Sequence, residues 1–311
     1  MGNSKTYIIT PTWNNSDYTI RCFDSIAKNT NDYIIVWVDN ASEESEREEV
    51  KNFLEKNNIP HIAILNDENL GFVKGTNQGL KKFLEDADAE YVVFQNNDTE
   101  VTPSWLERYI EVAESDPEIG LVGPVTSPCD SWQSVKYLSN KLSIFSDLPE
   151  YNNDYREYAK LINEKYEGRT YDITDGILAF FSTLLKREVV EQVGMLSEDY
   201  GVGFRDDDDY AERSRNLGWK LVLACDVFVF HNHRTTFKKR FSEDEIEEMM
   251  ANNMKTFRKK HRGLYFKIGK LDTDYFLSLM RKGWHTLRKQ GVRKFFSDLK
   301  NLLLHGRNYF K

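Results

Sequence analysis

Short apolar runs alternate with amphipathic stretches along the first 125 residues. The apolar runs are rich in β-branched and aromatic residues and predict strands at 7–10, 33–38, 62–65, 91–95 and 121–125. The stretches between them have helical periodicity, at about 18–28, 45–56, 75–84 and 104–114. Because strands and helices alternate, the sequence predicts an α/β fold with a mostly parallel sheet flanked by helices.

The second half of the chain has a different pattern. Residues 126–169 are irregular and rich in Tyr, Ser, Asn and Asp, which predicts a surface excursion or lid with a helix near 155–166. An apolar segment at 177–185, a short helix at 188–193, an acidic helix start at 206–209 and a strand near 221–230 predict an extension of the same sheet. We therefore expect one domain with halves at 1–125 and 126–240, and a helical extension over 241–311.

Charge separates this extension from the rest. The net charge is −8, but residues 251–311 hold 16 Lys and Arg against 3 Asp and Glu. Within 285–304, apolar residues from Val292 to Leu303 have helical spacing and basic residues take other faces. This basic amphipathic helix either packs on the domain or makes peripheral contact with an anionic membrane. The acidic remainder argues against nucleic acid as a partner.

Other features indicate the compartment. No apolar run reaches the roughly 18 residues of a membrane-spanning helix, and the N-terminus resembles neither a signal nor a transit peptide. The three cysteines are widely spaced, odd in number and without a zinc pattern, which fits reduced thiols. These features predict a soluble, cytoplasmic protein, with the inner face of the plasma membrane as the alternative location.

Polar residues follow each of the first four predicted strands. In parallel sheets, ligands bind beyond the carboxyl ends of the strands, so these residues are the first candidates for a site. Three common cofactor motifs are absent from the sequence: GxGxxG after the first strand, GxxxxGK[ST] and HExxH. Their absence argues against dehydrogenases, P-loop proteins and zincins.

Four spaced motifs carry a resemblance to a known family. They are TPTWN at 10–14, VDNAS at 38–42, NLGFVKGTNQG at 69–79 and QNNDTEV at 95–101. As an ordered set they resemble the donor half of family 2 glycosyltransferases, which are inverting enzymes with the GT-A fold. The resemblance continues through GFRDDDDYAERSRNLGW at 203–219 and VFVFHNHRTTF at 227–237, which are similar to the family's base-bearing segment and to its strand ending in a metal-binding histidine.

The resemblance implies a role for each motif. Residues 1–125 become the nucleotide-sugar half and 126–240 the acceptor and catalytic half. The implied donor-binding residues are Thr10, Pro11, Thr12, Asn14, Asp39, Asn40, Asn69, Gly71, Phe72, Lys74, Asn77, Asn96, Asn97 and Gly176. Asp39 is assigned to the nucleoside, and the glycine-punctuated helix start after Asn69 to the ribose and phosphate.

A divalent cation is also implied, since an acidic body needs one to hold a diphosphate. Asp98 offers the carboxylate oxygen that Mg²⁺ and Mn²⁺ prefer, and an imidazole suits Mn²⁺ better than Mg²⁺. With the following Arg-Thr-Thr-Phe, the resemblance to the family's metal-binding histidine is better at His231 than at His233. We therefore predict Mn²⁺ or Mg²⁺ bound by Asp98 and His231.

The catalytic base is predicted within the run of four aspartates. Crowded carboxylates raise each other's proton affinity, which suits a general base for a sugar hydroxyl. In the family pattern Glu-Asp-x-Asp-Leu, Asp206 stands in place of the Glu and Tyr210 in place of the Leu. This register favours Asp207 as the base, with Asp206 and Asp208 as the alternatives.

The sequence thus predicts a metal-dependent inverting hexosyl- or deoxyhexosyltransferase. The expected donor is an NDP-sugar, with UDP or dTDP favoured. The expected acceptor is a saccharide, preferably lipid-linked, in cell-envelope or capsular polysaccharide synthesis. The alternatives are a nucleotidyltransferase that makes an NDP-sugar, although the first strand lacks its glycine-rich basic loop, and a non-catalytic binding module on the same fold.

Overall fold

The computed structural model describes residues 5–128, 131–142, 144–151, 154–174, 176–232 and 242–261. The chain divides into two compact units, residues 1–250 and 251–311, which are described separately. Helix α10 (Glu243–Lys260) crosses the boundary between them. The predicted membrane contact at 285–304 and the alternative ligand His233 lie outside the described residues. In the part of the chain that is described, no helix combines the length and apolarity needed to cross a bilayer.

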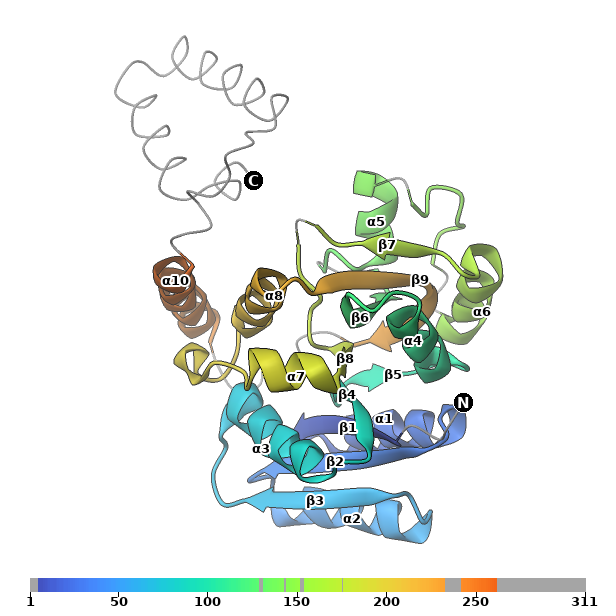
Figure 1. Cartoon of the computed structure of the whole chain (residues 1–311). Helices are drawn as coiled ribbons and strands as arrows, with labels where there is room; N and C mark the ends of the chain where they lie inside the picture. The colour runs from blue at the N-terminus through green and yellow to red at the C-terminus, as the bar shows by residue number, and fades with distance from the viewer. Residues whose placement is uncertain are drawn as a thin grey trace. The chain divides into compact units, whose positions relative to one another are not determined.

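A mixed sheet of nine strands forms the centre of the first unit, as far as the described residues show. Its order is β3-β2-β1-β4-β8-β6-β9-β5, and β7 pairs with β9 beside this path (Figure 1). The strands are β1 (Lys5–Thr12), β2 (Tyr33–Asn40), β3 (His61–Asn66), β4 (Ala89–Gln95), β5 (Thr99–Glu100), β6 (Ile119–Thr126), β7 (Thr170–Asp172), β8 (Ser182–Lys186) and β9 (Lys220–His231). Strands β3, β2, β1 and β4 are parallel neighbours, so their carboxyl ends share one edge of the sheet.

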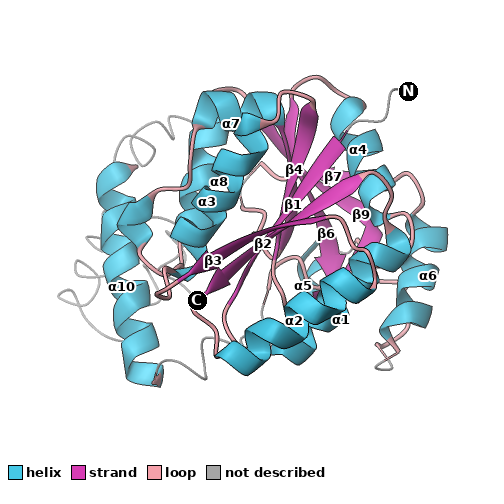
Figure 2. Ribbon diagram, turned by 90° about the horizontal axis from the view of Figure 1, so that it is seen from below, coloured by secondary structure: helices cyan, strands magenta, loops and turns pink. Residues whose placement is uncertain are grey.

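Helices cover both faces of this sheet. In Figure 2, α3, α7 and α8 lie on one face and α1, α2 and α4 on the other. The helices of the first unit are α1 (Ser16–Asn29), α2 (Glu44–Lys56), α3 (Gly71–Glu85), α4 (Trp105–Glu114), α5 (Val135–Leu142), α6 (Tyr155–Tyr166), α7 (Arg187–Val193) and α8 (Asp206–Asn216), with a 3₁₀ turn η1 (Glu198–Tyr200). The predicted α/β class, with a mostly parallel sheet flanked by helices, is confirmed.

Strand residues alternate between two hydrophobic clusters. In β1, Ile9 packs in the cluster beneath α3, whereas Ile8 packs in the cluster beneath α1 and α2. This alternation follows from the two-residue period of a strand, because both faces of the sheet are covered. The apolar strand runs therefore specify a sheet buried on both sides.

Strand β8 forms largely within the apolar segment that predicts an extension of the sheet, but its place in the strand order has no sequence signal. It runs antiparallel between β4 and β6 and separates the first four strands from the parallel pair β6 and β9. The strand covers residues 182–186, so it includes only the second half of the predicted apolar segment 177–185 and one residue beyond it. An apolar run predicts burial, but it does not say which strands will be the neighbours.

Helix α3 begins at Gly71, four residues before the predicted start. Its glycines at 71, 75 and 79 recur every four residues and therefore share one face of the helix. A Cβ on Gly79 would come 2.4 Å from a side-chain carbon of Ile9, and one on Gly75 would come 3.3 Å from Pro11. The glycines thus let α3 lie close to β1, which brings its first turn to the carboxyl edge of the sheet.

Candidate active site

The turn after β4 and the end of β9 bring two predicted metal ligands together. Thr99 pairs with His231 in the β5–β9 ladder, and the Asn232 N–H donates to the Asp98 carbonyl at 2.9 Å. The His231 Nε2 atom lies 3.1 Å from the Asp98 Oδ1 atom, and both side chains are 9% exposed. Residues 133 positions apart in sequence therefore present an oxygen and a nitrogen side by side.

This pair fits a divalent cation. Two adjacent ligands of an octahedral ion, each bound at about 2.1 Å, lie about 3.0 Å apart, close to the observed separation. No cluster of three or more Asp, Glu, His or Cys side chains suited to a metal occurs among the described residues. Mg²⁺ commonly takes one or two carboxylates together with substrate phosphates, so a two-residue site is of a familiar kind.

Asp39 is the penultimate residue of β2 and is almost fully buried. Its Oδ2 atom accepts from the Arg47 guanidinium through Nε at 2.9 Å and Nη2 at 2.8 Å, and from the Ser42 N–H at 3.1 Å. Arg47 also donates to the Asn66 carbonyl at the end of β3. Arg47 is not among the residues predicted from the sequence, because its position one turn into α2 carries no motif signal.

Amide side chains fix the first turns of α3 to the strand ends. The Asn66 amide bonds with Asn40 at 3.0 Å and with Gln78, and Asn40 donates to the Gly71 carbonyl at 3.3 Å. The Asn69 side chain accepts from the Gly71 N–H at 2.9 Å. One hydrogen-bond network at this edge therefore includes Asn40, Asn66, Gln78 and, through the Gly71 backbone, Asn69.

Gly71 meets the segment that precedes α8. Its φ is +76°, and a Cβ there would lie 2.8 Å from the Val202 Cα. The Phe72 N–H donates to the Val202 carbonyl at 3.2 Å. The N–H groups of Gly71 and Phe72 are thus bonded within the protein.

The aspartate run opens α8, and its members have different partners. Asp208 pairs with Arg205 at 2.8 Å. Asp209 pairs with Arg213 at 2.8 Å and accepts from the Tyr200 hydroxyl at 3.1 Å. These ion pairs compensate two of the four charges.

Asp206 and Asp207 form no ion pair with any of the residues that the structure describes. Burial raises the pKa of Asp206 to about 7. Burial, followed by the nearby Asp208 carboxylate, raises the pKa of Asp207 well above its usual range. Raised carboxyl pKa values are typical of groups that must accept a proton near neutral pH. The first half of the run therefore has the higher proton affinity, in keeping with the predicted position of the base.

The backbone before these aspartates is strained. Phe204 and Arg205 both have φ of +69°, a left-handed conformation that costs non-glycine residues energy and tends to occur at functional sites. Below the aspartates, the Tyr210 ring packs edge-on against Phe94 near the end of β4, with centroids 6.4 Å apart. The helix start is thereby fixed near the strand end that leads to Asp98.

The raised pKa of Asp206 yields a stability prediction. An unfolded aspartate titrates near 3.9, so between about pH 4 and 7 the folded state binds more protons and loses stability as the pH rises. We expect Asp206→Asn to match wild type in unfolding free energy near pH 4. The variant should then become the more stable protein by up to about 1.4 kcal/mol per pH unit toward pH 7.

Urea unfolding of both proteins at several pH values measures this difference. Asp209→Asn is the matched control in the same helix turn. Because it removes the partner of Arg213, it should lower stability at neutral pH. A pH-independent difference between wild type and Asp206→Asn would contradict the prediction.

Several predicted donor residues are placed in internal contacts. Asn77 is buried; its side-chain amide nitrogen donates to the Leu196 carbonyl at 3.0 Å, and its amide oxygen accepts from the Leu196 N–H at 2.9 Å. Asn97 donates to Thr19 at 3.0 Å, and Thr12 accepts from the Trp37 indole at 2.9 Å. Thr10 is fully buried. Their side chains connect elements of the domain, because strand-end motifs also have to hold the loops in place.

Other predicted residues stay at the polar edge. Asn14 has φ of +51° and bonds both Ser42 and Glu43, so it joins the loops that follow β1 and β2. Pro11, Phe72 and Asn96 are half-buried, and Lys74 is exposed on the first turn of α3. Gly176 lies beside α8, because Arg215 donates to its carbonyl and to that of Ile173.

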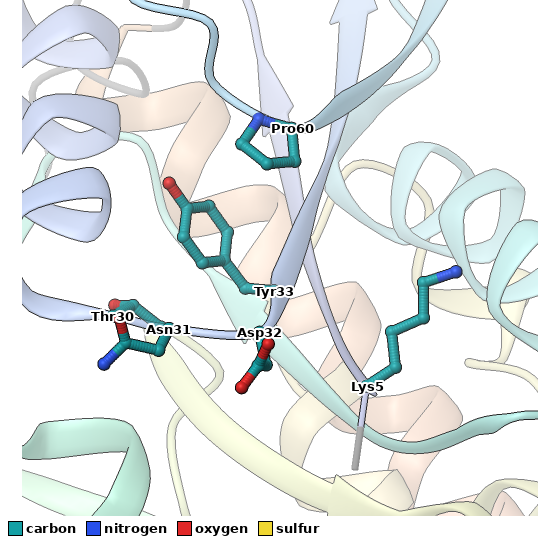
Figure 3. A pocket seen from close by; sticks show the side chains of 6 residues that line it. All are labelled: Lys5, Thr30, Asn31, Asp32, Tyr33 and Pro60. Carbon is teal, nitrogen blue, oxygen red and sulfur yellow. The ribbon is translucent and has the colours of Figure 1, made fainter. Parts of the chain in front are cut away.

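A separate surface hollow lies at the opposite edge of the sheet. It is found at the amino ends of β1 and β2, as Figure 3 shows, and its lining residues are Lys5, Thr30, Asn31, Asp32, Tyr33 and Pro60. None of the predicted site residues lines it. It is therefore not part of the candidate site.

Comparison with known proteins gives the family context. Residues 7–194 match the sequence model described as glycosyl transferase family 2. No curated protein sequence matches the chain.

Two solved structures share the fold. A structure of the mannosyltransferase PcManGT from Pyrobaculum calidifontis, in complex with GDP-Man and Mn²⁺, is 16% identical with a TM-score of 0.54, and the match covers 96% of this chain and 85% of that one. A structure of GalNAc-T7 with UDP, GalNAc and Mn²⁺ is 13% identical with a TM-score of 0.55, covering 73% of this chain. The match spans only 43% of the GalNAc-T7 chain.

Proposed function

Because this chain belongs to glycosyl transferase family 2, we propose that it transfers a sugar from an NDP-sugar to an acceptor hydroxyl with inversion and with a divalent cation. The observation that carries the proposal is the Asp98–His231 pair, 3.1 Å apart, at the sheet edge where α3 begins. The same edge carries Asp39 and lies close to the start of α8. One edge of the sheet would thus supply the ligands for a cation, a side chain that binds the nucleoside, and a general base.

Each group has a proposed role. Asp98 and His231 would hold Mn²⁺ or Mg²⁺, and the bound ion supplies charge neutralisation for the departing diphosphate. Asp39, held through one oxygen by Arg47, would accept a hydrogen bond from the nucleoside through the other. Asp207 would take the proton of the acceptor hydroxyl as the oxygen attacks the anomeric carbon, with Asp206 as the alternative base.

The relatives support a nucleotide-sugar donor, since the structures similar to this chain hold UDP or GDP-Man with Mn²⁺. We favour UDP or dTDP as the nucleotide. We also propose a saccharide acceptor on a lipid carrier, for cell-envelope or capsular glycan synthesis. That acceptor proposal rests on the basic sequence of residues 251–311.

A donor panel tests the function. The full chain is incubated with Mn²⁺ and UDP-, dTDP- or GDP-sugars, and released nucleoside diphosphate is measured. We expect slow hydrolysis of one UDP- or dTDP-sugar and faster release when a matching acceptor is added. Lipid-linked and free saccharides are compared as acceptors, and transfer only to the free form would contradict the lipid-linked proposal.

The same assay separates the alternatives. A nucleotidyltransferase would instead consume a nucleoside triphosphate and a sugar 1-phosphate and release pyrophosphate. A binding module would give no release with any donor. Either result would overturn the proposed transferase.

A further inference from the structure

We propose that Phe181 is a positioning residue that fixes both metal-binding groups, Asp98 and His231, for the cation. The inference rests on the proposed function, in which these two side chains hold Mn²⁺ or Mg²⁺. Phe181 immediately precedes β8 and is 3% exposed. Neither a sequence motif nor its apolar character distinguishes it from its neighbours.

The first contact of Phe181 is with the histidine. Its ring stacks on the His231 imidazole, with centroids 4.8 Å apart and planes 19° from parallel. A flat apolar surface against one face of the imidazole limits rotation of the ring. The Nε2 atom is thereby held toward Asp98, because a turned imidazole would lose the near-parallel contact.

The second contact is with the turn that carries the aspartate. The Phe181 carbonyl accepts the Asn96 N–H at 2.8 Å, at the first residue after β4. The other end of this turn is held by β9, through the Asn232 N–H on the Asp98 carbonyl. Because β5 contains only two residues, its own ladder offers little to hold Asp98 in place.

One residue therefore supports both halves of the site, the side chain acting on His231 and the backbone on the Asp98 turn. Groups that orient metal ligands typically change metal affinity by about 10- to 100-fold when they are lost. The carbonyl contact survives substitution, so a change of the Phe181 side chain tests the stacking contact alone. We expect the lower half of that range from aliphatic replacements.

The chain offers a matched control in the preceding residue. Phe180 is the same residue type and is 4% exposed, but it packs in the opposite hydrophobic cluster. Its ring contacts Phe94 and Tyr210, with centroids 5.0 and 5.7 Å away. Phe180→Leu and Phe181→Leu remove the same atoms from equally buried positions, and only the second touches the histidine.

The experiment measures Mn²⁺ binding to the purified full chain by electron paramagnetic resonance, with Mn²⁺ alone and with Mn²⁺ plus UDP. We expect Phe181→Leu to bind Mn²⁺ about 10-fold more weakly than wild type. Phe180→Leu should stay within about 2-fold, and Phe181→Tyr should retain most of the affinity because it keeps the ring. Thermal unfolding of each variant shows whether it is folded, and Phe181→Met replaces Phe181→Leu if the latter is not.

His231→Ala distinguishes failure of the inference from failure of the proposed function. If His231→Ala weakens Mn²⁺ binding while the aliphatic Phe181 variants behave like Phe180→Leu, Phe181 has no positioning role and the proposed metal site stands. If His231→Ala leaves Mn²⁺ binding unchanged, the metal site and the role of Phe181 both fail. Equal weakening by Phe180→Leu and Phe181→Leu would also overturn the inference, because it would indicate a general loss of packing.

Discussion

Replacing Asp207 with asparagine should lower sugar transfer by about 10² to 10⁴-fold, the usual contribution of a general base. The amide keeps the shape of the side chain but cannot take the proton from the hydroxyl of the acceptor sugar. Donor binding should be nearly unchanged, because the donor contacts are proposed at Asp39 and at the Asp98–His231 pair. Turnover with saturating donor and acceptor, and donor affinity by calorimetry, measure the two effects separately.

The other aspartates serve as controls for this assignment. Asp208 and Asp209 are each paired with an arginine, so Asp208→Asn and Asp209→Asn should reduce stability more than the chemical step. Asp206→Asn removes the other carboxyl group whose pKa is raised, so comparing it with Asp207→Asn shows which of the two is the base. Near-normal turnover in Asp207→Asn, together with a large loss in Asp206→Asn, would move the base by one residue.

Removing the cation should have an effect of similar size. We expect EDTA to abolish transfer and added Mn²⁺ to restore it, because charge neutralisation by a bound metal is worth several kcal/mol in the transition state. His231→Ala and Asp98→Ala should each lower turnover at limiting Mn²⁺ by about 10²-fold or more, which corresponds to a loss of about 2.8 kcal/mol of transition-state stabilisation. Turnover is measured across a Mn²⁺ titration for each variant.

A matched control for these two variants is Asn97→Ala. Asn97 belongs to the same turn but directs its amide to Thr19 of α1. It should show the Mn²⁺ dependence of wild type, even if its stability is lower. Undiminished turnover of the wild-type chain in chelator would remove the metal from the mechanism.

The candidate site was only partly predictable. Asp98 and His231 could be proposed from motifs at two strand ends, and the structure brings them together through the β5–β9 ladder. Asn77 belongs to an equally recognisable motif, yet its amide is used by the Leu196 backbone, 119 residues away. A motif fixes residue type and local conformation, but the partner of a polar side chain depends on which distant segment packs against it.

Sequence patterns predict the α/β class, most of the strands and helices of the first 125 residues, and the sheet edge at which polar residues gather. These follow from local periodicity and from the rule that parallel strands end at a common edge. The folded structure adds the antiparallel insertion of β8, the ion pair of Arg47 with Asp39, the unequal partners of the four aspartates and the stacking of Phe181 on His231. Apart from the local ion pairs of Asp208 and Asp209, each of these features joins separate elements, and no local pattern encodes such a contact. The burial that raises the pKa values of Asp206 and Asp207 likewise exists only once those elements have packed together.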